Sequence, residues 1–261
     1  MVIQFIDTKT TLKFIIDQIS SKRFGIYLRY GDGDFNLMVG ENDSLANADS
    51  ELQKIMIESL LIDSDCILFS IPHHCKELLT LEDGMFPGNH EVSIHQVDKF
   101  LSIIATHKKN IPLKLYSSVA LCFSASRSPK LVVELHKLIQ HLPVLFIGNR
   151  VYSNEFLVRL FGNNIKRINT PHRDSFLSYE TIFKELDSVF SNCYGKYEYF
   201  IIIMAAGCAG RGFSGKIYNN YTLRNYFILD YGSLLDYLYG INSRLYMDLD
   251  PPQKKYIFDN I

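Results

Sequence analysis

The sequence predicts an α/β protein with a mostly parallel, doubly wound sheet that carries helices on both faces. Short apolar runs alternate with segments of helical periodicity along the whole chain. Several of these runs are apolar at successive positions, as in strands that helices cover on both faces. The 261 residues contain no repeat and no linker of distinctive composition, so we predict one domain over 1–261.

The strands and helices follow one another in order. Seven apolar runs are predicted as strands, namely 24–29, 66–71, 113–121, 143–148, 165–170, 199–206 and 226–232. Six segments are predicted as helices, namely 9–20, 49–61, 91–107, 128–140, 153–161 and 175–190. In such sheets ligands bind outside the carboxyl ends of the strands, so functional residues are expected at those ends.

Composition excludes several classes of function. The net charge of −1, from 27 basic and 28 acidic residues, provides no basic field for nucleic acid. The five cysteines are scattered without a CxxC pair, which argues against a zinc site or a disulfide framework. No apolar run approaches the roughly 20 residues of a membrane helix, and the N-terminus does not resemble a signal peptide. A cytoplasmic protein without a transmembrane segment is expected.

The stretch "YGDGD" follows the first predicted strand and places acids at Asp32 and Asp34. Gly31 and Gly33 permit positive φ, so the two carboxylates can converge on one side of a tight turn. One or two carboxylates completed by water and phosphate suit Mg²⁺ or Mn²⁺. Arg29 is positioned to clamp a phosphate oxygen. The alternative is a polar turn in which Asp34 caps the following helix.

The stretch "GCAGRGFSGK" follows the predicted strand 199–206. A turn with Gly207 and Gly210 that leads into a helix can present backbone N–H groups to a phosphate. "GRGFSG" also matches the dinucleotide pattern, with Asp230 at the end of the next strand as the acid for the ribose. A third interpretation is that the small residues only allow close packing of a helix.

Polar residues follow three other predicted strands, namely His73 and His74, Asn149 and Arg150, and His172, Arg173 and Asp174. Each set has a structural alternative, since such residues also close turns, and Asp174 or Ser175 is suited to cap the helix 175–190. All three sets follow predicted strands, which favours the functional interpretation, because parallel strands place the loops at their carboxyl ends along one edge of the sheet.

The order of these segments resembles the GT-D glycosyltransferases, bacterial nucleotide-sugar-dependent enzymes first known as a domain of unknown function. The resemblance spans about residues 24 to 245 and rests on "LRYGDGDFNLM", "IP", "IGNR", "RINTPHRDSF", "IIIMAAGCAG" and "FILDYGSLLDYLYG". The family pattern R-F/Y-G-D-G-E corresponds to "RYGDGD" here, residues 29–34. The second acid is thus an aspartate, one methylene shorter than the family's glutamate.

The resemblance implies a Rossmann-like fold, a UDP-sugar or similar donor, and Mn²⁺ or Mg²⁺ held at Asp32 and Asp34, the candidate catalytic and metal residues. Some members read D-I-G-H-I-D where this chain has "DYGSLLD". Ser233 replaces the histidine, and Asp236 is the remaining acid, a candidate to orient an acceptor hydroxyl. The residues then expected to bind the nucleotide donor are Arg29, Gly31, Asn149, Arg150, Pro171, Arg173, Gly207 and Gly210.

The sequence therefore predicts a glycosyltransferase that acts on a glycan, lipid-linked or protein-linked acceptor. A lipid-linked acceptor would require peripheral contact at the inner face of the membrane. Two alternatives stay open, an NAD(P)-dependent oxidoreductase that uses "GRGFSG", and a non-catalytic module that binds nucleotides or glycans. The sugar, the acceptor and the oligomeric state are not indicated by any residue pattern.

Overall fold

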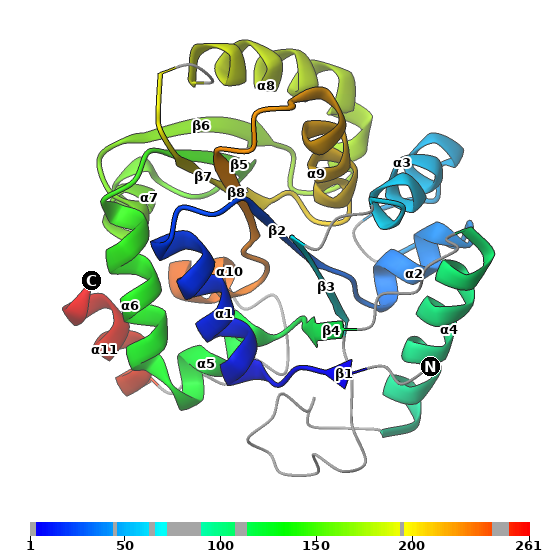
Figure 1. The fold of residues 1–261 in the computed structure, drawn as a ribbon, viewed down its shortest axis with the longest axis horizontal. Coiled ribbons are helices and arrows are strands. Elements are labelled where there is room, and N and C mark those ends of the chain that lie inside the picture. Colours follow the sequence, from blue (N-terminus) through cyan, green and yellow to red (C-terminus); the bar gives the residue numbers. More distant parts are fainter. Residues whose placement is uncertain are drawn as a thin grey trace.

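The computed structural model describes residues 4–43, 46–62, 66–71, 90–107, 114–193, 196–241 and 251–261. Within these residues eight strands form one sheet in the order β1-β4-β3-β2-β8-β7-β5-β6, and neighbouring strands run parallel. The strands are β1 (Gln4–Phe5), β2 (Gly25–Arg29), β3 (Ile67–Ile71), β4 (Lys114–Ser117), β5 (Val144–Asn149), β6 (Ile165–Thr170), β7 (Phe200–Ala205) and β8 (Tyr226–Asp230). The predicted α/β, doubly wound, Rossmann-like fold is confirmed (Figure 1).

The helices lie in two layers, one on each face of the sheet (Figure 1). The first layer contains α1 (Thr8–Ser20), α5 (Ala120–Arg127), α6 (Pro129–Gln140), α7 (Asn154–Phe161), α10 (Leu234–Tyr239) and α11 (Pro251–Asn260). The second contains α2 (Asp32–Met38), α3 (Ser50–Leu60), α4 (His90–His107), α8 (Tyr179–Cys193) and α9 (Ala209–Asn220). A 3₁₀ turn, η1 (Ser175–Ser178), leads into α8. None of the described helices is long and apolar enough to cross a membrane.

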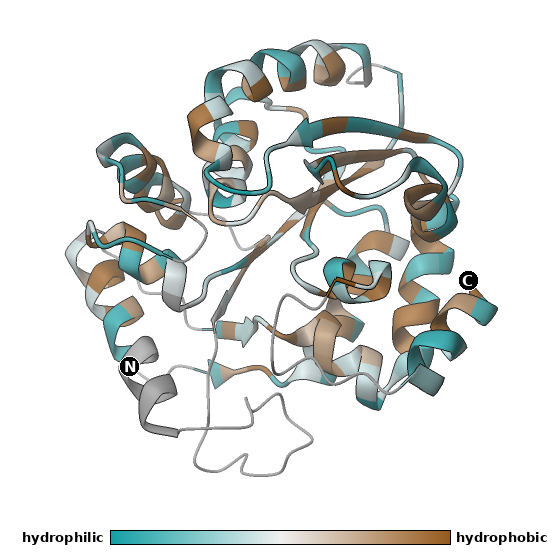
Figure 2. Cartoon of the chain, turned by 180° about the vertical axis from the view of Figure 1, so that it is seen from behind, coloured by the Kyte–Doolittle hydropathy of each residue, from teal (hydrophilic) through white to brown (hydrophobic). Residues whose placement is uncertain are grey.

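The composition of each strand follows its position in the sheet. β5 and β8, which have neighbours on both sides, are buried at every residue. β6 is an edge strand, and Lys166 and Asn169 within it are exposed. Figure 2 shows the same contrast, with apolar central strands and a largely hydrophilic β6. Continuous apolar runs therefore predict the central strands well, whereas exposed polar residues within a strand indicate a strand at the edge of the sheet.

The six predicted helices and six of the seven predicted strands are confirmed, with boundaries that differ by up to four residues; the largest difference is at 175–190, where α8 begins at Tyr179. The prediction of one strand over 113–121 is wrong in its second half, because β4 ends at Ser117 and α5 begins at Ala120. Apolar periodicity alone does not separate a buried strand from a buried helix over so short a run. β1, α5, α10 and α11 were not predicted, and α2 and α9 were expected only as the helices that follow the two glycine-containing turns, without boundaries.

The chain leaves neighbouring strands β2 and β8 toward opposite faces of the sheet. After β2 it enters α2, whose Phe35 belongs to the hydrophobic cluster of the second layer. After β8 it enters α10, whose Leu234 belongs to the cluster of the first layer. Adjacent parallel strands with opposite exits leave a crevice at their carboxyl ends, where ligands bind in open α/β sheets. The ends of β2 and β8 are therefore the topological switch point of this fold.

Helix α9 packs unusually close to its neighbours because of its glycines. A Cβ on Gly212 would lie 2.3 Å from Ile55 Cδ1 of α3, and one on Gly215 would lie 3.3 Å from Ser59 Cα. A Cβ on Gly210 would lie 2.8 Å from Met204 Cγ of β7. Absence of side chains at these positions lets α9 fit between α3 and the sheet.

We expect Gly212→Ala to lower the free energy of unfolding by about 1 to 2 kcal/mol. The added methyl overpacks against Ile55, at a typical cost of about 1–3 kcal/mol, which the better helix propensity of alanine offsets in part. Urea unfolding of the variant measures the loss. Combination with Ile55→Val, which removes Cδ1, should recover most of it. A variant more stable than the wild type would contradict close packing at this interface.

Candidate functional site

The motif at residues 29–34 forms a junction between a strand and a helix. β2 ends at Arg29 and α2 begins at Asp32. The expectation of positive φ in this turn is wrong, since Gly31 has a φ of −123° and Gly33 is not among the described glycines with positive φ. Gly33 lies inside the helix, where a Cβ would stand 2.5 Å from Asp43 Oδ1. Gly33 therefore permits close approach of Asp43, and neither glycine is needed here for an unusual backbone conformation.

Asp34, the third residue of α2, caps the start of that helix, which confirms one of the two interpretations of its role. Its Oδ2 accepts a hydrogen bond from the backbone N–H of Gly31 at 2.8 Å, the reciprocal half of a capping box. The residue is only 4% exposed. Its other oxygen, Oδ1, is buried and makes no hydrogen bond within the described part of the chain. The carboxylate thus faces the interior of the protein.

Four charged side chains meet at the switch point. The guanidinium of Arg211, on α9, lies 3.1 Å from Asp34 Oδ2 through Nη2 and 3.1 Å from Asp230 Oδ2 through Nη1. Arg29 Nη1 lies 3.9 Å from Asp230 Oδ1. Each of the four side chains is at most 14% exposed. We call Arg29, Asp34, Arg211 and Asp230 the buried charge cluster; its formal charges cancel.

Burial and pairing act in opposite directions on the acid–base properties of this cluster. Burial raises the pKa of the Asp34 carboxyl, while Arg211 and the Gly31 N–H lower it. Burial would lower the pKa of Arg211, but Asp230 and Asp34 raise it above its ordinary value. The Cys208 thiol beside Asp34 also has a pKa well above its ordinary value, because it is buried. Arg211 therefore stays protonated as the shared partner of two carboxylates.

Arg29 contacts residues at the ends of two other strands, β4 and β8. Its Nε donates a hydrogen bond to the carbonyl oxygen of Ser118, and its Nη1 faces Asp230. A Cβ on Gly232, the second residue after β8, would lie 1.2 Å from Arg29 Nη1. Gly232 also has a φ of +61°. The glycine therefore provides both the turn after β8 and the space in which the guanidinium lies.

The turn after β7 is open above its first glycine. Gly207 is exposed, has a φ of +57°, and would meet no atom within 4 Å if it carried a Cβ. Its carbonyl oxygen accepts a hydrogen bond from Arg211 Nη1 at 2.7 Å. Gly210 differs, because it is buried inside α9 and its N–H donates to the Gly207 carbonyl at 3.1 Å. Gly207 thus lines the turn, whereas Gly210 packs the helix.

This geometry removes the basis of the dinucleotide interpretation. "GRGFSG", residues 210–215, lies wholly within α9 instead of forming the turn at the end of β7. Asp230, the proposed ribose acid, is 4% exposed and paired with Arg211. The third interpretation of these glycines, close packing of a helix, is the one that the contacts of α9 confirm.

A second set of polar residues lies at the ends of β5 and β6. Asn149 Nδ2 lies 2.7 Å from His172 Nδ1, which joins the two loops, and Arg150 and Arg173 are exposed. Pro171, half-buried, begins the second loop. Only β7 separates β5 from β8, which ends at Asp230, so at about 4.8 Å per strand this set starts about 10 Å from the buried charge cluster.

The loop after β6 nevertheless reaches back toward the motif. Asp174 Oδ1 accepts a hydrogen bond from the backbone N–H of Asn47, in the segment between α2 and α3, at 3.0 Å. Asp174 makes no capping hydrogen bond at η1, so the prediction that it caps the following helix is wrong. Its left-handed backbone, with a φ of +47°, turns the chain toward that segment instead.

His73 and His74 lie outside the described residues.

Asp236 lies in the first turn of α10, on the other layer of helices. Its Oδ1 accepts a hydrogen bond of 2.5 Å from the hydroxyl of Tyr152, in the loop after β5. Tyr152 is buried, and burial together with the Asp236 carboxylate raises its pKa. One oxygen of Asp236 is therefore already engaged, and the tyrosine fixes the direction of the carboxylate.

The described residues do not fit a divalent cation with Asp34 as a direct ligand. Within the described ranges no three side chains of His, Cys, Asp or Glu are grouped to hold a metal. A cation at Asp34 Oδ1 would share one carboxyl group with the Arg211 guanidinium, whose charge repels it. The backbone places Asp32 at the first position of α2, but its side chain is not described, so its predicted role in metal binding stays a prediction.

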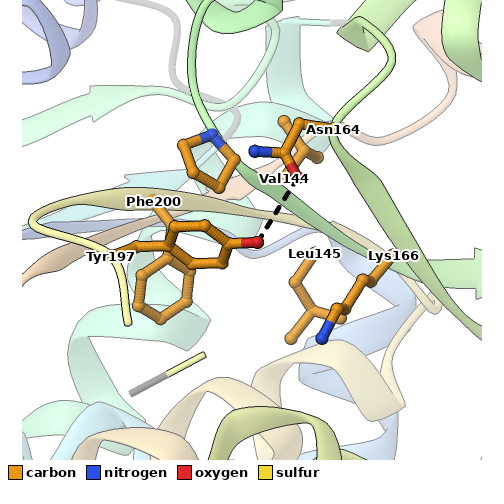
Figure 3. A pocket seen from close by; sticks show the side chains of 7 residues that line it. Val144, Leu145, Asn164, Lys166, Tyr197 and Phe200 are labelled. Atoms are coloured by element: carbon orange, nitrogen blue, oxygen red, sulfur yellow. Dashed lines mark hydrogen bonds between the residues drawn. The ribbon is translucent and has the colours of Figure 1, made fainter. Parts of the chain in front are cut away.

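A small hollow lies at the opposite edge of the sheet, where β5 and β7 begin (Figure 3). Val144, Phe200 and Lys166 line it, and the Tyr197 hydroxyl donates to Asn164 Oδ1 at 3.4 Å across it. Its volume of about 10 Å³ has room for one water molecule. The hollow is too small for a substrate and lies away from the carboxyl ends.

Sequence reasoning missed the role of Arg211 in this site. The arginine stood inside a glycine pattern, and nothing in its neighbours indicates that it faces Asp34, 177 positions earlier. Asp230 was identified only as a ribose acid of the dinucleotide alternative. β8 ends in Asp230 and α9 carries Arg211 in its first turn, but their positions in the sequence do not indicate that the two side chains pair.

Comparisons with known proteins give matches among solved structures alone. No protein-family model matches the chain, and no curated protein matches it. A glycosyltransferase of the domain of unknown function 1792 from Streptococcus sanguinis is similar at 19% identity and a TM-score of 0.63, over 89% of this chain and 82% of that chain.

Two further structures of domain 1792 are also similar. A selenomethionine-substituted structure matches at 17% identity and a TM-score of 0.60, over 97% of this chain and 93% of that chain. Another, described as having a distinct glycosyltransferase fold, matches at 18% identity and a TM-score of 0.60, over 92% of this chain and 83% of that one. The chain therefore has the fold of these domains, and the resemblance seen in the sequence is confirmed at the level of the fold.

Proposed function

From this shared fold we propose that the protein is a glycosyltransferase. It moves a sugar from a nucleotide-sugar donor to a glycan, lipid-linked or protein-linked acceptor. The donor that we propose is a UDP-sugar. The observation that carries the proposal is the position of "RYGDGD" at the topological switch point of a fold similar to domain 1792 glycosyltransferases. Ligands of open α/β sheets bind at that point, so the motif lies where a donor is expected.

Glycosyl transfer breaks the bond between the sugar's anomeric carbon and the nucleoside diphosphate, which leaves as an anion. The open Gly207 turn at the start of α9 supports binding of that anion, because its backbone is exposed and the helix dipole is positive there. Gly31 has open space as well, since a Cβ would meet only Asp34 Oδ2, at 3.8 Å. Groups that favour the leaving anion stabilise the transition state.

The loops after β5 and β6 support binding of the rest of the donor or of the acceptor. Asn149, Arg150, Pro171 and Arg173 lie there, and the exposed guanidinium groups of the two arginines suit phosphate or sugar hydroxyls. We propose that Asp236, directed by Tyr152, orients the acceptor hydroxyl. Dependence on Mn²⁺ or Mg²⁺ is proposed through Asp32 alone, and we assign the ion no further contact.

Thermal stability of the pure protein tests the proposal. UDP, GDP, UDP-sugars and NAD(H) are each added with Mn²⁺ and with EDTA. A ligand that binds only the native state at a hundredfold excess over its Kd stabilises it by about 2.7 kcal/mol. Stabilisation by UDP or a UDP-sugar supports the transferase, and its loss in EDTA supports the metal. Stabilisation by NAD(H) alone would contradict both, and donor binding without hydrolysis or transfer would indicate a binding module.

We expect Asp32→Asn to remove most of the metal-dependent stabilisation by UDP while changing the melting temperature of the free protein little. A first-turn carboxylate contributes only about 0.3–1 kcal/mol through the helix dipole. Glu155→Gln is the matched control, since Glu155 is an exposed acid in the first turn of α7, on the other layer. Full metal-dependent binding by Asp32→Asn would sink the assignment of this residue.

A further inference from the structure

The carboxylate of Asp34 connects both turns at which the proposed function places the donor diphosphate. Its Oδ2 accepts from the Gly31 N–H at 2.8 Å, which fixes the turn after β2. The same oxygen holds Arg211 Nη2 at 3.1 Å, and Arg211 Nη1 donates to the Gly207 carbonyl at 2.7 Å, which fixes the turn after β7. One carboxylate thus sets the position of one turn relative to the other.

Charge and burial leave this carboxylate little capacity for another cation. Its side chain is 5% exposed, and that of Arg211 is 11% exposed. The buried charge cluster is neutral, with two arginines and two aspartates. A divalent ion at Asp34 would add two positive charges beside the largely buried guanidinium of Arg211, and such charge is costly in a medium of low dielectric constant.

We propose that Asp34 is a positioning residue that holds Arg211, and through it the Gly207 turn, rather than a ligand of a divalent cation. This inference rests on the proposed function for the identity of the ligand, but its structural part does not. Asp32 and Asp34, two positions apart in one motif, then have different tasks. Asp32, at the first position of α2, is the residue proposed to bind the metal ion, and Asp34 connects the motif to α9.

The structural part is tested by a cycle of three variants, Asp34→Asn, Arg211→Met and the double variant. Each single variant leaves the buried charge cluster with a net charge of one unit, so its melting temperature should fall by about 10 °C. The double variant keeps only Arg29 and Asp230, which again sum to zero, and should recover at least half of that loss. The double variant is also the one expected to fold if a single variant does not. Losses that simply add would overturn the pairing.

Hydrogen exchange gives a readout that metal ligation alone would not change. Asp34→Asn should accelerate exchange of amides at 207–211 by at least tenfold relative to the wild type, while amides of β5 stay protected. Asp17→Asn, an exposed acid on α1, is the matched control and should leave residues 207–211 unchanged. Unchanged exchange at 207–211 in Asp34→Asn would overturn the positioning role.

Titration of Mn²⁺ in the presence of UDP separates positioning from ligation. In Asp34→Asn the Kd for UDP should rise about tenfold. The Mn²⁺ concentration that gives half-maximal UDP binding should change less than threefold. A Mn²⁺ requirement raised tenfold or more, with normal exchange at 207–211, would make Asp34 a ligand. If the wild type binds no nucleotide, the proposed function fails, and the variant cycle and the exchange still decide whether Asp34 holds Arg211.

Discussion

Replacement of Gly232 by alanine should lower the free energy of unfolding by about 2–4 kcal/mol and weaken nucleotide binding at least tenfold. Two independent costs combine. The residue has a φ of +61°, a conformation that costs an alanine about 1–2 kcal/mol. Its methyl group would also lie 1.2 Å from Arg29 Nη1, so the guanidinium must leave Asp230 and the Ser118 carbonyl. Loss of such buried polar contacts costs about 1–3 kcal/mol more.

Two comparisons separate these costs. Gly40 has a φ of +83° and open space around it, so Gly40→Ala should show the conformational cost alone, about 1 kcal/mol. In the background Arg29→Ala, the Gly232→Ala substitution should cost no more than Gly40→Ala, because the clash has been removed. Denaturant unfolding and UDP titration measure both effects. Equal losses for Gly232→Ala and Gly40→Ala would contradict the position of Arg29.

The sheet was predictable because its strands carry their own signal. Ile201 to Ile203 are β-branched, apolar at successive positions and buried in β7, a pattern typical of strands that helices cover on both faces. The order of the strands in the sheet was not predictable. Alternation of strands with helices predicts a parallel sheet, but it does not indicate which strands are neighbours. The adjacency of β2 and β8, which creates the switch point, joins residues about 200 positions apart and leaves no local trace.

The candidate site was predictable in composition and not in contacts. The motif at 29–34, the glycines after β7 and the acid at Asp236 all lie at the carboxyl edge, as expected. Their partners were not predictable, because Arg211 and Tyr152 gain meaning only from the carboxylates that they face. Glycine-rich stretches were the weakest signal. The same glycine spacing, G-x-G-x-x-G, occurs in turns that bind phosphate and in helices that pack closely. The two can be distinguished only when the residue at which β7 ends is known.

A buried histidine in the first layer of helices links stability to pH. His136, on α6, is fully buried, and its Nδ1 lies 3.0 Å from the Leu160 carbonyl oxygen. The carbonyl can only accept, so Nδ1 carries the proton and Nε2 accepts from the Tyr231 hydroxyl, 2.6 Å away. Burial lowers the pKa of this imidazole to about 4, from an ordinary value of 6.5. The neutral ring is therefore part of the folded core.

We expect the free energy of unfolding to fall by about 2 kcal/mol between pH 7.5 and pH 5 through His136 alone. The unfolded chain takes up a proton below pH 6.5, whereas the folded one does so only near pH 4, so stability is full above 6.5 and declines through that window. The whole shift corresponds to roughly 3 kcal/mol at 1.36 kcal/mol per unit. Urea unfolding at pH 7.5 and pH 5 measures the difference in the free energy of unfolding between the two pH values. This difference should be about 2 kcal/mol smaller in His136→Gln than in the wild type. His141→Gln, at the exposed end of the same helix, should keep it, because that ring is solvated in both states. A His136→Gln protein with the wild-type dependence on pH would mean that other groups carry the acid sensitivity.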